Sequence, residues 1–158
     1  GVQEALPKQR SYIQEKLKEY YNYVGIPRDL NKGEEVGIFL LSHKFFVIDE
    51  GYVWLNATKK PGQPGFGARL PRLLTYAVVE DQQLNDKSLV INTHLDTKVR
   101  GTEGGIRIIL DTIDSLIAED AKYRKKPIDS IYITGDFNID DRDPMFDVLY
   151  QSKYKFAS

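Results

Sequence analysis

Residues 131–138 read Ile-Tyr-Ile-Thr-Gly-Asp-Phe-Asn, and the fold is predicted outward from this stretch. Its apolar, β-branched start predicts a buried strand, and Gly135 marks a backbone turn or a close approach. Because side chains two apart in a strand point to the same side, we expect Asp136 and Asn138 to project together at the strand's end. There the carboxylate can orient a water molecule and the amide can donate to a phosphoryl oxygen. An Asp/Asn turn that merely closes the strand is the alternative.

Residues 89–96, Leu-Val-Ile-Asn-Thr-His-Leu-Asp, have the same form. An apolar strand again leads to a polar end, where His94 and Asp96 are spaced by two. A helix-length segment separates the two stretches, and a β-α-β unit of this kind brings both strand ends to one edge of a sheet. A third short stretch, at the start of the chain, supplies Glu4. We therefore expect glutamate, histidine and Asp/Asn side chains to meet at one edge.

Three motifs resemble the endonuclease/exonuclease/phosphatase superfamily, which has the deoxyribonuclease I-like fold. They are Gln3-Glu4, Asn-Thr-His-Leu-Asp at 92–96 and Gly-Asp-Phe-Asn at 135–138. The sequence is most similar to the superfamily's bacterial, mostly uncharacterised members. Complete members begin with a strand that ends in a metal-site asparagine and close with a Ser-Asp-His segment, neither of which is found here. The resemblance implies a single domain of this type over residues 1–158, truncated at both ends.

The pattern of strands and helices predicts an α/β (α+β) fold with two mixed β-sheets packed face to face and helices outside, a four-layer sandwich. Helices are expected at residues 5–20 and 106–117, where apolar residues recur at helical spacing. The strands at 36–42 and 45–55 are separated by a short turn, which suggests a hairpin. A mobile loop is expected at 56–67, and Asp143 is expected to cap a short helix at 145–151.

Glu4 is the predicted metal ligand. With Asp136 and Asn138 it forms an oxygen-rich, sulfur-free set, which selects a hard divalent cation: Mg²⁺, with Mn²⁺ or Ca²⁺ as alternatives. The implied reaction is in-line attack of water on phosphorus. Asp136 would position the water, Asn138 would donate to an equatorial oxygen, and protonated His94 would stabilise the transition state or protonate the leaving group.

The resemblance implies two further site residues. Glu35 falls on the carboxylate that the superfamily uses to orient its catalytic histidine, although Glu34 could be the match instead, and a solvated acidic turn is the alternative. Arg72 matches the arginine of a Leu-Pro-Arg motif that faces substrate phosphate, since guanidinium offers a planar fork of donors. A solvated loop arginine is the alternative. The role of Asp96 stays open, and His43 is interpreted as a turn residue.

Composition limits the classes of function. The formal net charge of −1 gives no overall basic field, which argues against a high-affinity non-specific DNA binder. The absence of cysteine excludes disulfides and thiolate metal sites. No apolar stretch approaches membrane-spanning length, so a soluble protein is expected. Its localisation stays open, secreted or periplasmic included, because any targeting segment would precede Gly1.

These features predict a metal-dependent phosphoesterase that hydrolyses phosphodiesters or phosphomonoesters. The alternative is a catalytically impaired remnant that keeps the fold and binds phosphate or metal. Nucleic acid, inositol phosphate and phospholipid headgroups all remain candidate substrates, because fold does not fix function. The oligomeric state is open.

Overall fold

The strands of this computed structural model, which describes residues 1–140 and 142–154, form two sheets. The small sheet is antiparallel in the order β1-β3-β2, with β1 at Val2–Ala5, β2 at Tyr21–Pro27 and β3 at Glu35–Leu41. The large sheet has the order β4-β5-β6-β7, with β4 at Phe45–Trp54, β5 at Leu73–Asp81, β6 at Lys87–His94 and β7 at Ser130–Asp136. The large sheet is mixed, because β6 and β7 pair in parallel whereas β4, β5 and β6 are antiparallel neighbours.

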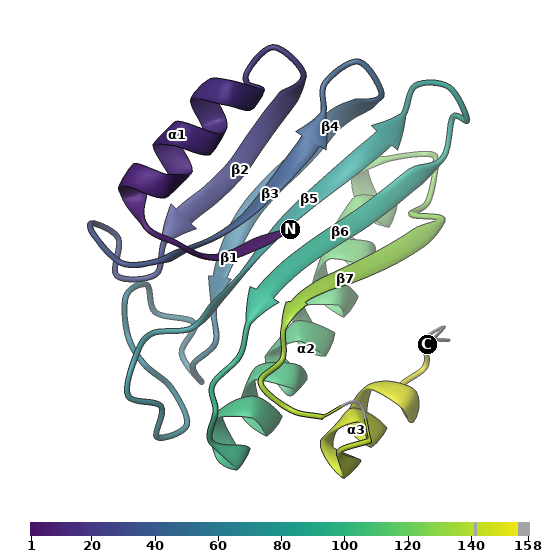
Figure 1. Cartoon of the computed structure of the whole chain (residues 1–158). Coiled ribbons are helices and arrows are strands. Elements are labelled where there is room, and N and C mark those ends of the chain that lie inside the picture. Colours follow the sequence, from purple (N-terminus) through teal and green to yellow (C-terminus); the bar gives the residue numbers. More distant parts are fainter. Residues whose placement is uncertain (141, 155–158) are drawn as a thin grey trace.

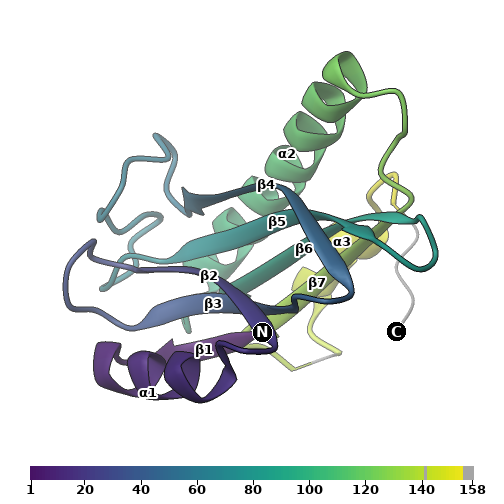
Figure 2. The ribbon, with the colours of Figure 1, turned by 90° about the horizontal axis from the view of Figure 1, so that it is seen from above.

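The two sheets pack face to face and a helix covers the outer side of each (Figures 1 and 2). Helix α1, at Pro7–Leu17, lies on the small sheet, and helix α2, at Val99–Tyr123, lies on the large one. A 3₁₀ turn, η1 at Pro144–Phe146, and a short helix, α3 at Asp147–Tyr150, follow β7. The predicted α/β sandwich is confirmed, except that the small sheet is purely antiparallel.

Strand β5 is buried on both faces and links the two cores. Ala77 and Val79 pack with the small sheet, while Leu74 and Val78 pack in the cluster beneath α2. This alternation follows the two-residue period of a strand, and burial on both sides explains the nearly continuous apolar sequence. The centre of the sandwich is therefore a rigid support for the strand ends beside β5.

Helix α2 contains the predicted apolar stripe but extends beyond it at both ends. Ile106, Ile109 and Ile113 are fully buried against the large sheet. Its first turns carry glycines rather than apolar residues, and Gly101 packs so closely on Asp96 that an added Cβ would lie 2.7 Å from the Asp96 Cβ. Apolar spacing alone could not reveal this glycine-rich start.

The connection between β3 and β4 differs from expectation. The predicted hairpin is wrong, because β3 and β4 belong to different sheets and residues 42–44 carry the chain between them. Loop 56–67 is organised around buried Asn56, whose Nδ2 donates to the carbonyl oxygens of Lys60 and Gln63.

The Asp143 cap is confirmed, since its carboxylate accepts from the Met145 N–H at 2.9 Å. Among residues 1–140 and 142–154, no helix has the length and apolar character needed to span a bilayer.

Candidate active site

The ends of β6 and β7 bring His94 and Asp136 together, as the β-α-β reading predicts. In the parallel pair the two residues are direct register partners. Gly135 makes this approach possible: its φ is 149°, and an added Cβ would lie 2.2 Å from the Thr93 carbonyl oxygen. The glycine before Asp136 is therefore required by the backbone, independently of any chemistry.

Glu4 joins the pair from the small sheet. A register irregularity in β1 and a left-handed backbone, φ 55°, turn this residue out of the regular strand. His94 Nε2 lies 3.9 Å from Glu4 Oε1 and 3.9 Å from Asp136 Oδ2. Both distances exceed hydrogen-bond range, so the carboxylates flank the imidazole without closing on it.

His94 is buried, with 5 % of its surface exposed, whereas the Glu4 and Asp136 carboxylates reach solvent. Burial lowers the pKa of His94 from its ordinary value of 6.5, and the Arg72 cation lowers it further. The nearby carboxylates, led by Asp136, oppose this shift of the His94 pKa without reversing it. A lowered pKa makes the neutral imidazole of His94 more accessible, and the protonated His94 expected from the sequence stays a prediction.

The glutamate beside His94 is Glu34, not Glu35. Glu35 is fully buried on the other side of the small sheet, where it accepts from Arg10 Nε at 3.2 Å and from the Tyr23 hydroxyl at 2.8 Å. Glu34 offers an oxygen within 4.8 Å of ligand atoms of Glu4 and His94. Adjacent residues at a strand end point in opposite directions, so only one of the two could face the histidine.

Arg72 lies behind His94 rather than in the open site. Its Nε is 3.7 Å from Asp96 Oδ2, and its Nε and Nη1 are buried without a hydrogen-bond partner among the described residues. A cavity of about 10 Å³, lined in part by Arg72, Glu34 and His94, has room for roughly one water molecule. Direct contact between Arg72 and a substrate phosphate stays a prediction, and Asp96 holds the arginine in place.

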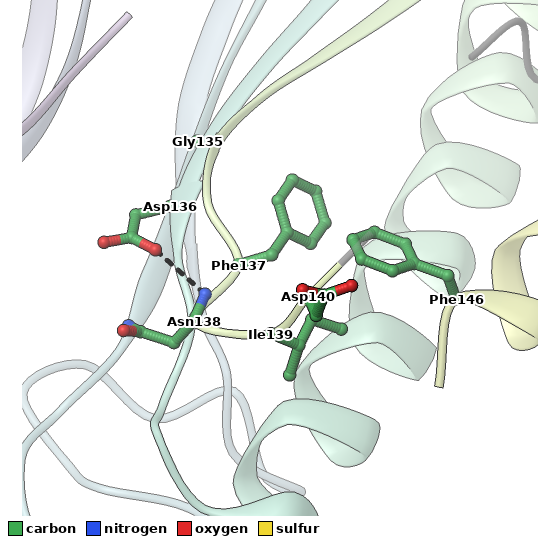
Figure 3. Close-up of a pocket in the computed structure, with 7 residues that line it drawn as sticks. All are labelled: Gly135, Asp136, Phe137, Asn138, Ile139, Asp140 and Phe146. Carbon is green, nitrogen blue, oxygen red and sulfur yellow. Dashed lines mark hydrogen bonds between the residues drawn. The ribbon is translucent and has the colours of Figure 1, made fainter. Parts of the chain in front are cut away.

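Asn138 is fixed by two hydrogen bonds. Its backbone N–H donates to Asp136 Oδ1 at 2.9 Å (Figure 3). Its Nδ2 donates to the Leu95 carbonyl oxygen, also at 2.9 Å. Its φ of 54° is left-handed, a conformation that asparagine tolerates better than most residues. One amide hydrogen is thus already used inside the protein, which leaves one N–H and the amide oxygen for a ligand.

An open hollow of about 560 Å³ lies over the end of β7. Asp136 and Asn138 line one side, and Phe137 and Phe146 line the other with ring centroids 5.4 Å apart (Figure 3). Its size falls in the range of small-molecule sites. Figure 3 shows the side chains of Asp136 and Asn138 on the opposite side of the chain trace from the two rings, so the hollow's aromatic wall and the polar groups point in different directions.

Asn92 supports this edge, a role that the sequence alone did not indicate. Its fully buried amide donates to the carbonyl oxygens of Val2 and Gly37 at 2.8 and 2.9 Å, and accepts from Gln3 Nε2 and Thr134 Oγ1 at 2.6 and 3.0 Å. These bonds join both sheets immediately behind the site. The available signal was its position: two residues before His94, on the same face of one strand.

Glu4, Glu34 and His94 form the group of possible metal ligands in the described part of the chain. Of the predicted carboxylate donors, Glu4 belongs to this group and Asp136 does not. Glu34 Oε2 is already paired with Arg28 Nη1 at 2.6 Å, whereas Glu4 is mostly exposed and accepts no hydrogen bond from a described residue. Glu4 is therefore the carboxylate best placed to take a hard cation.

Several solved bacterial structures share this fold. An endonuclease/exonuclease/phosphatase family protein from Bacteroides thetaiotaomicron has a TM-score of 0.84 and 27 % identity, covering 96 % of this chain and 53 % of its own. A mannosyl-6-phosphatase from the same species has a TM-score of 0.83 and 27 % identity, covering 96 % and 55 %. An endonuclease/exonuclease/phosphatase from Bacteroides vulgatus has a TM-score of 0.84 and 25 % identity, covering 98 % and 57 %.

The chain has the fold of the endonuclease/exonuclease/phosphatase superfamily, as its likeness to these structures shows. It spans about half the length of the superfamily structures that it matches. No protein-family model matches the sequence, and no curated protein matches it. The resemblance carried by the three motifs is thus confirmed by the arrangement of sheets and helices of this superfamily, while the individual site roles remain to be tested.

Proposed function

We propose that the protein hydrolyses phosphate esters at the ends of β1, β6 and β7, with a divalent cation as cofactor. The observation that carries this proposal is the position of His94 Nε2, 3.9 Å from carboxylate oxygens of both Glu4 and Asp136. A buried imidazole flanked by two solvent-accessible carboxylates provides acid–base groups at an open surface. The nearby hollow offers room for a substrate.

Glu4 would hold the cation, with Glu34 and Asp136 as its acidic neighbours around His94. The oxygen donors suit Mg²⁺, and Mn²⁺ or Ca²⁺ remain alternatives. Such an ion, when bound, withdraws charge from phosphoryl oxygens and stabilises the negative charge that develops on them. The exposure of Glu4 fits this role, because Mg²⁺ keeps several of its waters.

Asp136 is proposed to orient the attacking water. The Asn138 N–H fixes Oδ1 of this carboxylate, so that Oδ2, the oxygen nearest His94, is left to accept from water. The remaining amide N–H of Asn138 can donate to a phosphoryl oxygen. These preorganised groups would act without rearranging as charge develops.

His94 is proposed to contact the phosphate as a neutral imidazole. A ring N–H can donate to a phosphoryl oxygen, and an unprotonated ring nitrogen can accept a proton from water. Burial and Arg72 lower the pKa of His94, which keeps this neutral form available near neutral pH. Arg72 would act through the electrostatics of His94 in addition to any contact with substrate.

The structural neighbours support a phosphate ester as the substrate class. One neighbour is a mannosyl-6-phosphatase at 27 % identity, which favours including sugar phosphates among the candidates. Nucleic acid and inositol or lipid phosphates remain in the test, because one superfamily fold supports several substrates.

A substrate panel tests the proposal on the full-length protein. Phosphomonoesters and phosphodiesters of sugars, nucleosides, inositol and choline are each supplied with Mg²⁺, Mn²⁺ or EDTA, and His94→Ala is the inactive control. We expect cation-dependent release of phosphate or alcohol from at least one class. If the wild type turns over none of them but binds Mg²⁺ and phosphate, the remnant alternative replaces the proposal.

A further inference from the structure

A second hollow, of about 480 Å³, lies between loop 56–72 and the start of α2. It is lined by Phe66, Gly67, Arg100, Glu103, Gly104 and Arg107. The four helical residues fall at i, i+3, i+4 and i+7, so they share one face of α2. That face points away from the core stripe of Ile106, Ile109 and Ile113, and no role in the proposed hydrolysis uses it.

Phe66 is held in this hollow at a cost in backbone strain. Its φ is 53°, a left-handed conformation that is unfavourable for a bulky residue, and Gly67 follows with φ 77°. The ring lies directly on Gly104: a Cβ added there would meet three ring atoms at 2.5 to 2.7 Å. Gly104, which has no side chain, thus leaves room for the ring, and Phe66 as a whole residue is still 36 % exposed.

The surroundings of the hollow are basic although the whole chain is not. Residues 56–72 contain four Lys or Arg side chains and no Asp or Glu, and residues 97–107 contain three Lys or Arg and one Glu. Glu103 pairs with Arg107 at 2.9 Å and with no other described cation, which leaves the charge of Arg100 uncompensated. The surface around the hollow is therefore basic even though the net charge of the whole chain is −1.

The hollow adjoins the proposed active site. Arg72, at the end of the same loop, contacts Asp96, and Asp96 packs on Gly101, which directly follows Arg100 in α2. Lys98 Nζ reaches the Gly67 carbonyl oxygen at 3.4 Å and ties the loop to the helix. A substrate with one phosphate beside His94 could extend along this face.

We propose that this hollow binds the distal part of the substrate, a ring joined to a second phosphate group. The ring packs on Phe66 and the second phosphate pairs with Arg100, with Arg107 completing the cationic wall. An aromatic side chain between arginines suits such a group, because sugar and base rings stack on aromatic faces and guanidinium binds phosphate through paired donors. The inference rests on the proposed function for the placement of the first phosphate only.

Calorimetric binding in EDTA, without catalysis, tests this inference on the full-length protein. The probes are adenosine 3′,5′-bisphosphate against adenosine 5′-monophosphate, and glucose 1,6-bisphosphate against glucose 6-phosphate. The two pairs distinguish a nucleotide from a sugar phosphate as the source of the ligand. For at least one pair, we expect the bisphosphate to bind about fivefold or more tightly than the monophosphate, as an added charge-assisted contact predicts.

Three variants locate the effect. Arg100→Gln should reduce the bisphosphate advantage to about twofold or less. Phe66→Asn removes the ring but keeps a residue that accepts the left-handed backbone, and it should weaken both members of the preferred pair about fivefold. Lys122→Gln removes an exposed charge at the far end of α2 and should bind as the wild type does.

The inference is overturned if neither bisphosphate binds more tightly than its monophosphate, or if Arg100→Gln and Phe66→Asn both bind like the wild type. An equal loss in Lys122→Gln would also overturn it, because the effect would then be long-range charge rather than a site. Since no metal or turnover is involved, a protein that hydrolyses nothing but shows the preference would refute the proposed function and keep this inference.

Discussion

His94 and Asp136 are direct register partners across the parallel pair of β6 and β7, and His94 Nε2 lies 3.9 Å from Asp136 Oδ2. Their backbones are fixed by the sheet, so the separation of the two groups depends little on loop conformation. Glu4 reaches the same nitrogen from the other sheet. A site built on strand ends holds acid–base groups more accurately than a site built on loops.

Asp136→Asn should damage rate far more than stability. The change keeps the shape of the side chain but removes the charge proposed to orient water, so turnover should fall about a hundredfold or more. Stability should change by about 1 kcal/mol or less, because the carboxylate is half exposed. Turnover and urea denaturation are measured on the same preparation. If the variant unfolds at a lower urea concentration than the wild type but keeps normal turnover, Asp136 only caps a turn and does not act in catalysis.

Asn138 is tested by two substitutions that differ in backbone strain. Asn138→Gly removes the amide but accepts the φ of 54°, whereas Asn138→Ala removes the amide and adds strain. If the amide acts on substrate, both variants should lose turnover at least about tenfold, while Asn138→Ala should unfold about 1 kcal/mol more easily than Asn138→Gly. Normal turnover in Asn138→Gly would limit the amide to its structural bond with Leu95.

The protonation of His94 should respond to its neighbours in opposite directions. Arg72 lowers the pKa of His94 and Glu4 raises it, so Arg72→Met should raise that pKa and Glu4→Gln should lower it. Arg72→Lys keeps the charge and should leave the pKa of His94 low. Because the pKa of His94 is depressed in the folded protein, stability should fall as the pH drops below the ordinary value of 6.5.

NMR titration of the imidazole signals measures this directly, since the chain has two histidines. The second histidine, His43, is exposed in the turn after β3, and the variant His43→Gln assigns the remaining signal to His94. Movement of the His94 curve in the same direction for Arg72→Met and Glu4→Gln would contradict the described geometry.

Asn92→Ala should be strongly destabilising. The change leaves buried carbonyl and side-chain groups of both sheets without their hydrogen-bond partners. We therefore expect a loss of about 3 kcal/mol or more in the free energy of unfolding. Asn22→Ala on the exposed face of β2 is the matched control and should change stability by about 0.5 kcal/mol or less. Equal effects of the two substitutions would refute the bridging role of Asn92.

The features that follow from local pattern were predictable from the sequence. The apolar runs before His94 and Asp136 and the helical stripe between them sufficed for the β-α-β unit, and Asp143 caps its helix through purely local geometry. Which of Glu34 and Glu35 faces the histidine was not predictable, because a shift of one residue reverses the face of a strand.

Tertiary contacts decided the remaining differences. The turn at 42–44 is short enough for a hairpin, yet β3 pairs with β1 and β2 and β4 pairs with β5, because both sheets need their apolar faces covered. The bond from Asn138 to the Leu95 carbonyl oxygen and the burial of Arg72 behind His94 join residues far apart in the chain. Nothing in the local sequence around either residue indicates these partners.

The most direct test of metal-dependent hydrolysis is the initial rate on the preferred phosphate ester as Mg²⁺ is titrated into the EDTA-treated full-length protein. We expect no turnover without the ion, saturation in the wild type, and a half-saturating Mg²⁺ concentration at least about tenfold higher in Glu4→Gln, because that change removes the charged oxygen ligand. A rate that persists in EDTA, or an identical Mg²⁺ curve for Glu4→Gln, would contradict the account.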